Sequence, residues 1–425
     1  MRSTRFLGRR WTAPTVLLLA TALVATGCGG GGEDGPVELR YSWWGNADRA
    51  ELMREAIDLF EAEHPDITIT PTFSEYNAYW EKLSTEAAGG GMADVAQMDI
   101  SYLREYADRG LLLDLSELEG NGLDTGDLVD GFEQAGVIDD ARYAVPVAAN
   151  TFALFYVPEL FEAAGAPAPE PGWSWDDYHE AIAAVTEHTG GEPYGGADYT
   201  GLIWALELQL RQEGGELFTE DGRLAFDEPR LAEFWNETAG FREDEIVVPA
   251  AQYVQAQPVS PLGANIGASE FNWDNFLARY EGEADAEVAL APVPTSDPER
   301  SGQYLRPSMM LAASSQTEHP EQAAELIDFL INSPEVGELF GGNRGIPATN
   351  VQRESARLDG VDRAIADYEE ERAADLRELP PVPPAGMGSL EAEFIRLSEE
   401  VGYGRLTPQD AAGEFFAFAD RTLSS

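Results

Sequence analysis

The residue types that usually carry out catalysis form no recognisable catalytic pattern in this chain of 425 residues. Lys82 is the only lysine, and no glycine-rich loop precedes it, which excludes a phosphate-binding P-loop. Carboxylate pairs such as Asp176 and Asp177 arise by chance among 77 acidic residues and do not indicate glycoside hydrolysis. We therefore expect no enzymatic activity, no cofactor and no bound metal. The histidines never fall within metal-ligand spacing of one another: His64, His179, His188 and His319.

Cys28 is the only cysteine, and its surroundings indicate a modified residue. Four arginines precede the apolar run 12–25, and small residues follow it, which is the order of a secretory signal peptide over residues 1–27. The sequence ATGC (25–28) resembles a bacterial lipobox, although Ala25 stands where leucine is usual. We expect a lipid on Cys28, a flexible glycine-rich tether over 28–36, and an exported protein held on the outer face of the cell membrane, as in Gram-positive bacteria. The alternative is plain secretion with a free thiol, and the export route, Sec or twin-arginine, stays open.

The net charge of the chain is −50, from 27 basic and 77 acidic residues, which excludes nucleic acid as a partner. The acidic residues are spread along the whole chain, so we interpret them as a surface that favours solubility, for which salty surroundings would be one reason. The alternative interpretation is a site for a cationic ligand.

Helix and strand patterns alternate along the chain, which predicts α/β lobes. Strands are predicted over 38–44, 67–73 and 93–99, with helices over 50–65 and 76–91 between them. Two such strand–helix–strand units predict a parallel sheet, whose ligands bind beyond the carboxyl ends of the strands. Ser174 is positioned as the N-cap of a later helix. A proline-rich segment, 378–388, separates the body of the chain from two predicted closing helices.

Four segments of the chain carry a family resemblance: EAIDLFEAEHPDITIT (55–70), ADVAQMDISYLREYADRGLLLDL (93–115), FALFYVPELFEAAG (152–165) and MLAASSQTEHPEQAAELIDFLINSPE (310–335). Together they resemble the family 1 extracellular solute-binding proteins of bacterial ABC importers, the group that includes maltodextrin-binding proteins. They occur in the family's order over nearly the whole chain after the signal peptide. The resemblance implies an α/β, two-lobed periplasmic-binding-protein fold (type II, Venus-flytrap), with hinge strands between lobes that close on a ligand.

The resemblance also implies boundaries and partners. Residues 37–147 with 304–345 would form lobe 1, and 148–303 with 346–425 would form lobe 2, with the hinge near Pro146. The expected function is that of a substrate-binding lipoprotein: a monomer that captures a sugar and delivers it to the permease subunits of an ABC importer.

Candidate ligand contacts in lobe 1 follow the predicted strands. A pyranose ring presents C–H groups that pack on an aromatic face, while its hydroxyls need polar partners. Trp44 follows the first strand, and Asp99 follows the third; the alternatives are a core position for Trp44 and a helix N-cap for Asp99. The other candidates in this part of the chain are Asn46, Glu75, Tyr76 and Gln97, with Asn150 just past the hinge.

In lobe 2, the segment GASEFNWDNF (267–276) resembles the place where a family tryptophan stacks on the sugar, and Trp273 with Asn272 fits it. The alternative for Trp273 is helix packing. Arg306 and Arg344 lie in segments that the family keeps near the cleft, although each could equally form an ordinary ion pair. The region that contributes aromatic contacts in relatives supplies Tyr199 and Trp204.

Two further classes of function stay open on the sequence alone. A binding protein for a cationic ligand such as a polyamine or peptide would place acids, and no stacking tryptophan, in the cleft. A secreted glycoside-active enzyme would need two carboxylates that converge in one cleft.

Overall fold

The computed structural model describes residues 36–219 and 221–423, and Cys28, the signal peptide and all of the tether before Pro36 lie outside them. The chain begins with the predicted strand–helix–strand pattern: β1 (Val37–Trp44), α1 (Ala47–Glu63), β2 (Ile67–Ser74), α2 (Tyr76–Ala88) and β3 (Val95–Met98). β1 pairs in parallel with β2 on one side and β3 on the other. Helix α1 forms because its buried residues recur at helical spacing, and it ends at Glu63, with His64 as its C-cap directly before Pro65.

The main sheet has the strand order β10-β6-β9-β3-β1-β2. The strands that join the parallel part from later in the chain run antiparallel to their neighbours: β9 (Leu305–Ala313) pairs with β3 and β6, and β10 (Ile346–Pro347) pairs with β6. Consequently residues about 200 positions away from β3 in the sequence lie next to its carboxyl end.

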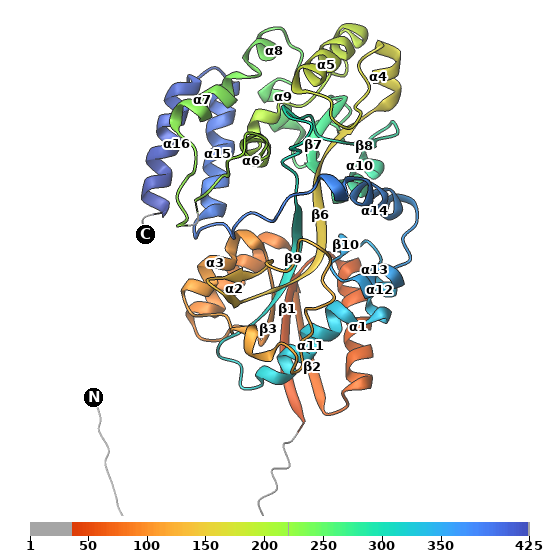
Figure 1. The fold of residues 1–425 in the computed structure, drawn as a ribbon, viewed down its shortest axis with the longest axis vertical. Helices are drawn as coiled ribbons and strands as arrows, with labels where there is room; N and C mark the ends of the chain where they lie inside the picture. The colour runs from red at the N-terminus through yellow and green to blue at the C-terminus, as the bar shows by residue number, and fades with distance from the viewer. Residues whose placement is uncertain (1–35, 220, 424–425) are drawn as a thin grey trace, which may run out of the picture. The chain divides into compact units, whose positions relative to one another are not determined.

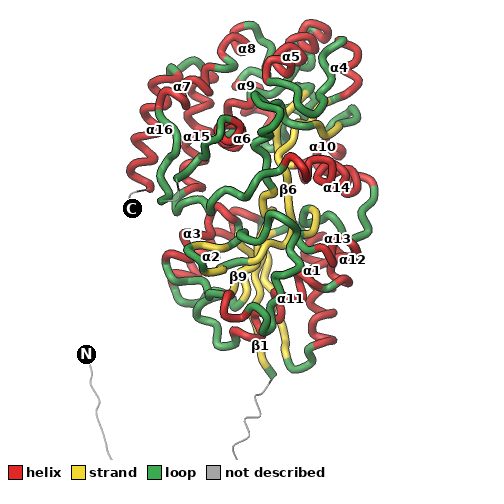
Figure 2. Tube along the Cα trace, in the orientation of Figure 1, coloured by secondary structure: helices red, strands yellow, loops and turns green. Residues whose placement is uncertain are grey.

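Strand β6 (Val145–Tyr156) is shared between two sets of strands (Figures 1 and 2). Its first half pairs with β9 as far as Thr151 opposite Leu305. From Phe152 onwards it pairs with β7 (Ser269–Trp273) and β8 (Ala289–Ala291). Strand β6 therefore changes its pairing partner between Thr151 and Phe152, and we call this point the β6 changeover. Pro146, the residue around which the sequence predicted the hinge, lies five residues earlier, next to a register shift that accommodates its missing N–H.

The remaining helices cover the sheet and the segments around β7 and β8 (Figure 1). Ser174 caps α5 as predicted, in a capping box with Asp177. The proline-rich segment is followed by the two predicted closing helices. The helix bounds are α3 (Ile100–Asp108), α4 (Pro158–Ala164), α5 (Trp175–Thr189), α6 (Ile203–Gln212), α7 (Glu228–Asn236), α8 (Ala239–Glu243), α9 (Ala250–Ala256), α10 (Leu277–Glu283), α11 (Pro320–Asn332), α12 (Pro334–Phe340), α13 (Asn350–Ser355), α14 (Gly360–Arg372), α15 (Met387–Gly402) and α16 (Pro408–Leu423).

Shorter elements connect these helices and strands. They are the two-stranded ladder of β4 (Val137–Ile138) and β5 (Ala141–Arg142), and the 3-10 helices η1 (Leu115–Leu118), η2 (Tyr199–Gly201), η3 (Asp274–Phe276) and η4 (Ala373–Asp375).

Two large hydrophobic clusters lie on either side of the β6 changeover. One gathers buried residues from 39–149 and 305–348, together with Val382. The other gathers residues from 152–293 and 387–419. A smaller cluster joins the end of β6 to α10 and α14. The lobe boundaries drawn from the sequence remain a prediction. No helix within 36–219 or 221–423 is long and apolar enough to cross a membrane.

Candidate functional site

Arg306 contacts two tryptophan rings. It is the second residue of β9, and its guanidinium carbon is 4.1 Å from the centroid of the Trp204 ring and 4.9 Å from that of Trp273. The two rings, from α6 and the end of β7, have centroids 6.0 Å apart and planes at 65°. A guanidinium at such distances is attracted by the negative faces of both indoles. Three predicted residues that are distant in the sequence thus form one contact group.

Asp99 joins this group from the side of the first hydrophobic cluster, on which Arg306 also lies, whereas the two tryptophans pack on the second. It follows β3 and caps α3, because its Oδ1 accepts a hydrogen bond of 2.9 Å from the Ser101 backbone N–H. The same oxygen is 3.9 Å from the Arg306 Nη2, and this nitrogen also donates to the Ser101 hydroxyl at 3.3 Å. Asp99 can therefore cap α3 and face Arg306 at the same time, so the two roles that the sequence left open for it are compatible.

Glu391 is a member of the site that the sequence analysis missed. It lies on α15, and its Oε1 accepts a hydrogen bond of 2.9 Å from the Trp204 indole N–H. Burial raises the pKa of this carboxyl, and the positive charge of Arg306 partly offsets that rise. No sequence signal could have selected it, because it is one of 77 acidic residues and carries no motif.

An aromatic group on α2 and α3 lies beside Asp99. The Tyr76 hydroxyl is 3.5 Å from the Asp99 Oδ2, at the limit of a hydrogen bond, and the Tyr76 side chain is 39% exposed. Trp44 contacts the edge of Tyr76, with ring centroids 5.5 Å apart, but it is buried, as is Trp43. Tyr102, another residue that the sequence analysis missed, stacks on Trp80 at 4.0 Å in this group. Tyr76 is therefore the exposed member of this aromatic group.

Two predicted polar residues near the sheet end have unsatisfied side-chain atoms. Gln97 on β3 and Asn150 on β6 are buried, and within the described ranges the Gln97 Nε2 and the Asn150 Oδ1 have no hydrogen-bond partner. Asn150 lies opposite Arg306 in the ladder of β6 and β9. A buried polar atom without a partner is costly, so each amide is suited to a water molecule or a ligand group.

The other predicted residues have local structural roles or partners outside the group around Arg306. Asn46 caps α1 by accepting from the Arg49 N–H at 2.9 Å, and Glu75 is the exposed N-cap residue of α2. The Asn272 amide donates to the Tyr280 hydroxyl at 3.1 Å. Arg344 is buried against the Phe340 ring, 3.9 Å from its centroid, and burial lowers the pKa of its guanidinium to about 10.

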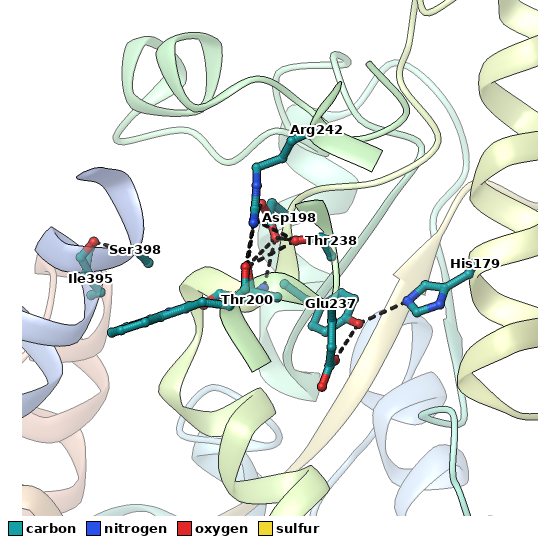
Figure 3. A network of polar contacts seen from close by, with 10 residues as sticks. His179, Asp198, Thr200, Glu237, Thr238, Arg242, Ile395 and Ser398 are labelled. Carbon is teal, nitrogen blue, oxygen red and sulfur yellow. Dashed lines mark hydrogen bonds and ion pairs between the residues drawn. The ribbon is translucent and has the colours of Figure 1, made fainter. Parts of the chain in front are cut away.

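Tyr199 lies in the second hydrophobic cluster and has partners of its own. It is 1% exposed, and its hydroxyl donates to Glu237 at 2.9 Å and contacts the His179 ring nitrogen at 3.0 Å (Figure 3). The preceding residue, Asp198, accepts hydrogen bonds from the Thr200 N–H and hydroxyl. This network fixes η2, the turn that leads into α6, and so positions Trp204. Its further members are Thr238 and Arg242, which also donate to Asp198 (Figure 3).

The site has a mixed electrostatic character. One guanidinium, Arg306, faces two carboxyl groups, Asp99 and Glu391, and two indoles. No group of three or more metal-binding side chains occurs among the residues that the structure describes. Indole faces, carboxylate acceptors and guanidinium donors together can hold a ligand that has C–H faces and several hydroxyl groups.

Residues 44–336 match the sequence model of the bacterial extracellular solute-binding proteins. The chain belongs to this family. The resemblance stated from the sequence is thereby confirmed, and so is the α/β fold of these solute-binding proteins, whose two-lobed form agrees with the two clusters on either side of β6.

The matches of this solute-binding protein to solved structures and to curated relatives cover most of its length. It is similar to an extracellular solute-binding protein family 1 structure from Alicyclobacillus acidocaldarius, with 28% identity, a TM-score of 0.72, and coverage of 92% of this chain and 100% of that one. A putative binding protein of Brucella abortus is 24% identical over 360 residues, 83% of this chain and 84% of the relative. A periplasmic oligogalacturonide binding protein from Yersinia enterocolitica is 22% identical, with a TM-score of 0.75 and coverage of 91% and 99%.

Proposed function

We propose that this solute-binding protein captures a sugar, a mono- or oligosaccharide, between its two lobes and delivers it to the permease of an ABC importer. The observation that carries the proposal is the placement of Trp204 and Trp273 around Arg306, with Asp99 facing them from the other hydrophobic cluster. The indoles offer flat apolar faces for a sugar ring, and Asp99 and Arg306 offer an acceptor and donors for its hydroxyls. The oligogalacturonide named for the Yersinia relative supports a carbohydrate ligand.

A ligand closes the lobes only if it binds the closed state more tightly than the open state. A site assembled from both clusters meets this condition, because its full set of contacts exists only when Asp99 faces the two tryptophans. Arg306 affects how a sugar can bind, because its guanidinium already covers part of the Trp204 and Trp273 rings. A sugar must therefore share these ring faces with the guanidinium or displace it.

A thermal-shift panel of sugars, polyols, amino acids and polyamines tests the proposal. A ligand present at 100 times its dissociation constant stabilises the protein by about 2.7 kcal/mol, which a melting curve resolves. We expect a carbohydrate to raise the melting temperature and the other classes to leave it unchanged. Stabilisation by amino acids alone would contradict the assignment.

A cationic ligand is the second candidate, and one contact favours it. The rings of Trp204 and Trp273 already contact a cation, the guanidinium of Arg306, with Asp99 and Glu391 beside it. Aromatic faces flanked by carboxylates are suited to organic ammonium groups. Stabilisation by polyamines in the same panel, without any response to sugars, would favour this candidate.

We further propose that Cys28 carries a lipid and anchors the protein to the outer face of the cell membrane. The signal-peptide pattern and the lipobox-like ATGC before this residue support the proposal. Mass spectrometry of the N-terminal peptide from the native host tests it, with release of a Cys28→Ala variant into the medium as the expected consequence. An unmodified Cys28 in the mature protein would contradict the anchor and leave the binding proposal untouched.

A further inference from the structure

Two buried carboxyl groups meet at the β6 changeover. Asp274, the first residue of η3, is 0% exposed, and Glu369 on α14 is 2% exposed. The Asp274 Oδ2 accepts a hydrogen bond of 2.7 Å from the backbone N–H of Thr151, the last residue of β6 that pairs with β9. Asp274 also follows directly after Trp273 of the candidate site.

The two carboxyl groups lie within hydrogen-bonding contact of each other. The Asp274 Oδ1 and the Glu369 Oε1 have no donor among the residues that the structure describes. Two ionised carboxylates have only acceptor atoms, so they can form a hydrogen bond only when one of them is protonated. Burial raises the pKa of both groups, and for Asp274 the charge of Glu369 adds to this effect.

The charges around the pair compensate one carboxylate, not two. Arg353 on α13 places its Nη2 3.0 Å from the Glu369 Oε2. Arg372, the next guanidinium along α14, is paired with Asp375 at 3.1 Å. Glu370, beside the pair, adds negative charge, and the neutral Tyr368 hydroxyl faces Asp274. A second buried negative charge in this setting would be left without a partner.

The contacts of this pair extend across the changeover. Arg353 donates through its Nε to the Pro347 carbonyl of β10, at 2.7 Å, and Pro347 pairs with β6 on the near side, at Ala148. Asp274 holds Thr151, and on the far side the Tyr368 hydroxyl donates to the Phe152 carbonyl at 3.2 Å. Helix α14 is thus tied to β6 on both sides of the point where the strand changes partner.

Protons can reach this site from solvent. Arg353 and Glu369 are part of the lining of a pocket of about 450 Å³, together with Asp130, Leu305 and Glu370. The pocket is lined by residues 129–131 and by residues of α13, α14 and the segment after α14. A protonation change would therefore need no unfolding of the protein.

We propose that Asp274 and Glu369 share one proton, and that this proton is a structural ligand that fastens α14 to β6 at the β6 changeover. Loss of the proton leaves two carboxylates in contact, which repel each other and loosen the link between Thr151, Asp274 and Arg353. Because the pair holds its proton more tightly in the folded than in the unfolded chain, its contribution to stability is complete below the ordinary carboxyl pKa. That contribution is lost as the pH rises through the raised pKa values of the two carboxyl groups.

Asp274→Asn tests the proposal because it supplies the missing hydrogen permanently. The carboxamide oxygen can still accept from Thr151, while its NH₂ group donates to Glu369. Melting temperatures are measured from about pH 5 to about pH 9, on the purified protein. The wild-type melting temperature should fall towards high pH, and this fall should be at least halved in the variant. The matched control is Glu371→Gln, an exposed carboxyl on the same helix, which should keep the wild-type profile.

Glu369→Gln is the second variant, should Asp274→Asn fail to fold. Its amide can donate to Asp274 and accept from Arg353, so the same flattening is expected. Infrared difference spectra provide an independent measurement, since the band of a protonated carboxylic acid at neutral pH should weaken in both variants. Profiles parallel to wild type, with that band unchanged, would overturn the proposal. Neither outcome bears on the ligand, so the sugar-binding proposal stands or falls separately.

Discussion

The guanidinium of Arg306 lies 4.1 Å from the centroid of the Trp204 ring, on a strand that belongs to the sheet of the first hydrophobic cluster, while Trp204 belongs to a helix packed on the second. This contact, together with the 3.9 Å approach of Arg306 to Asp99, joins the two halves of the candidate site. The effect of a substitution on ligand binding should therefore depend on whether it removes a tryptophan ring, the Asp99 carboxylate or the guanidinium that joins them.

Trp273→Ala should weaken sugar binding about tenfold to a hundredfold. Loss of a buried aromatic contact with a ligand ring removes roughly 1.5–3 kcal/mol, and each 1.4 kcal/mol is about a factor of ten. Titration calorimetry with the ligand found in the panel measures the change. Tyr403→Ala is the control, because Tyr403 is also a partly exposed aromatic residue but lies at the end of α15. Equal affinities in the wild type and Trp273→Ala would remove Trp273 from the site.

Asp99→Asn should separate the two roles of this residue. Asparagine caps helices about as well as aspartate, so the free energy of unfolding should change by less than about 1 kcal/mol. A hydrogen bond from a sugar hydroxyl to a charged acceptor contributes roughly 1.5–3 kcal/mol, and its weakening should raise the dissociation constant about tenfold. Chemical denaturation and calorimetry measure the two effects. A large loss of stability with unchanged affinity would mean that Asp99 is only a helix cap.

Arg306→Ala should distinguish the two ligand classes. For a neutral sugar, loss of the guanidinium donors should lower affinity about tenfold, since a charged hydrogen bond is worth roughly 1.5–3 kcal/mol. For a cationic ligand, the substitution uncovers the ring surfaces of Trp204 and Trp273 that Arg306 contacts and removes a like charge, so affinity should increase. The same calorimetric titration therefore gives changes of opposite sign. An unchanged affinity for every ligand class would place Arg306 outside the binding contacts.

Glu270→Gln should stabilise the protein at alkaline pH. Burial raises the pKa of Glu270 to about 7, and a hydrogen bond from the Leu262 N–H to its Oε2, at 3.1 Å, only partly offsets this. Its pKa is higher in the folded chain, so its contribution is complete below pH about 4.5 and is lost as the pH rises through about 7. Urea unfolding should show a reduced loss of stability towards high pH, by at most about 3 kcal/mol.

The control for Glu270 is Glu281→Gln, an exposed carboxyl on α10, which should leave the pH profile unchanged. A profile of Glu270→Gln that coincides with wild type would show that Glu270 does not titrate differently on folding. Because Glu270 and the pair of Asp274 and Glu369 respond in the same direction, the double variant of Glu270→Gln with Asp274→Asn should be flatter than either single variant.

The local features of this protein could be predicted from the sequence. The strands and helices up to β3, the caps at Asp99 and Ser174, and the closing helices all follow from patterns within a few residues, because helix and strand periodicity and capping are short-range properties. The family could be recognised for a related reason: its motifs occur in a fixed order along the chain.

The contacts between distant residues were decided only by the tertiary structure. Nothing in the pattern around Glu391 distinguishes it from the other acidic residues, yet the packing of α15 beside α6 brings it to Trp204. Asp274 and Glu369 are equally inconspicuous in the sequence, and only the fold brings them together at the β6 changeover. Composition and periodicity determine which residues are buried or exposed, whereas the pairing of charges depends on three-dimensional distance, which a one-dimensional pattern does not encode.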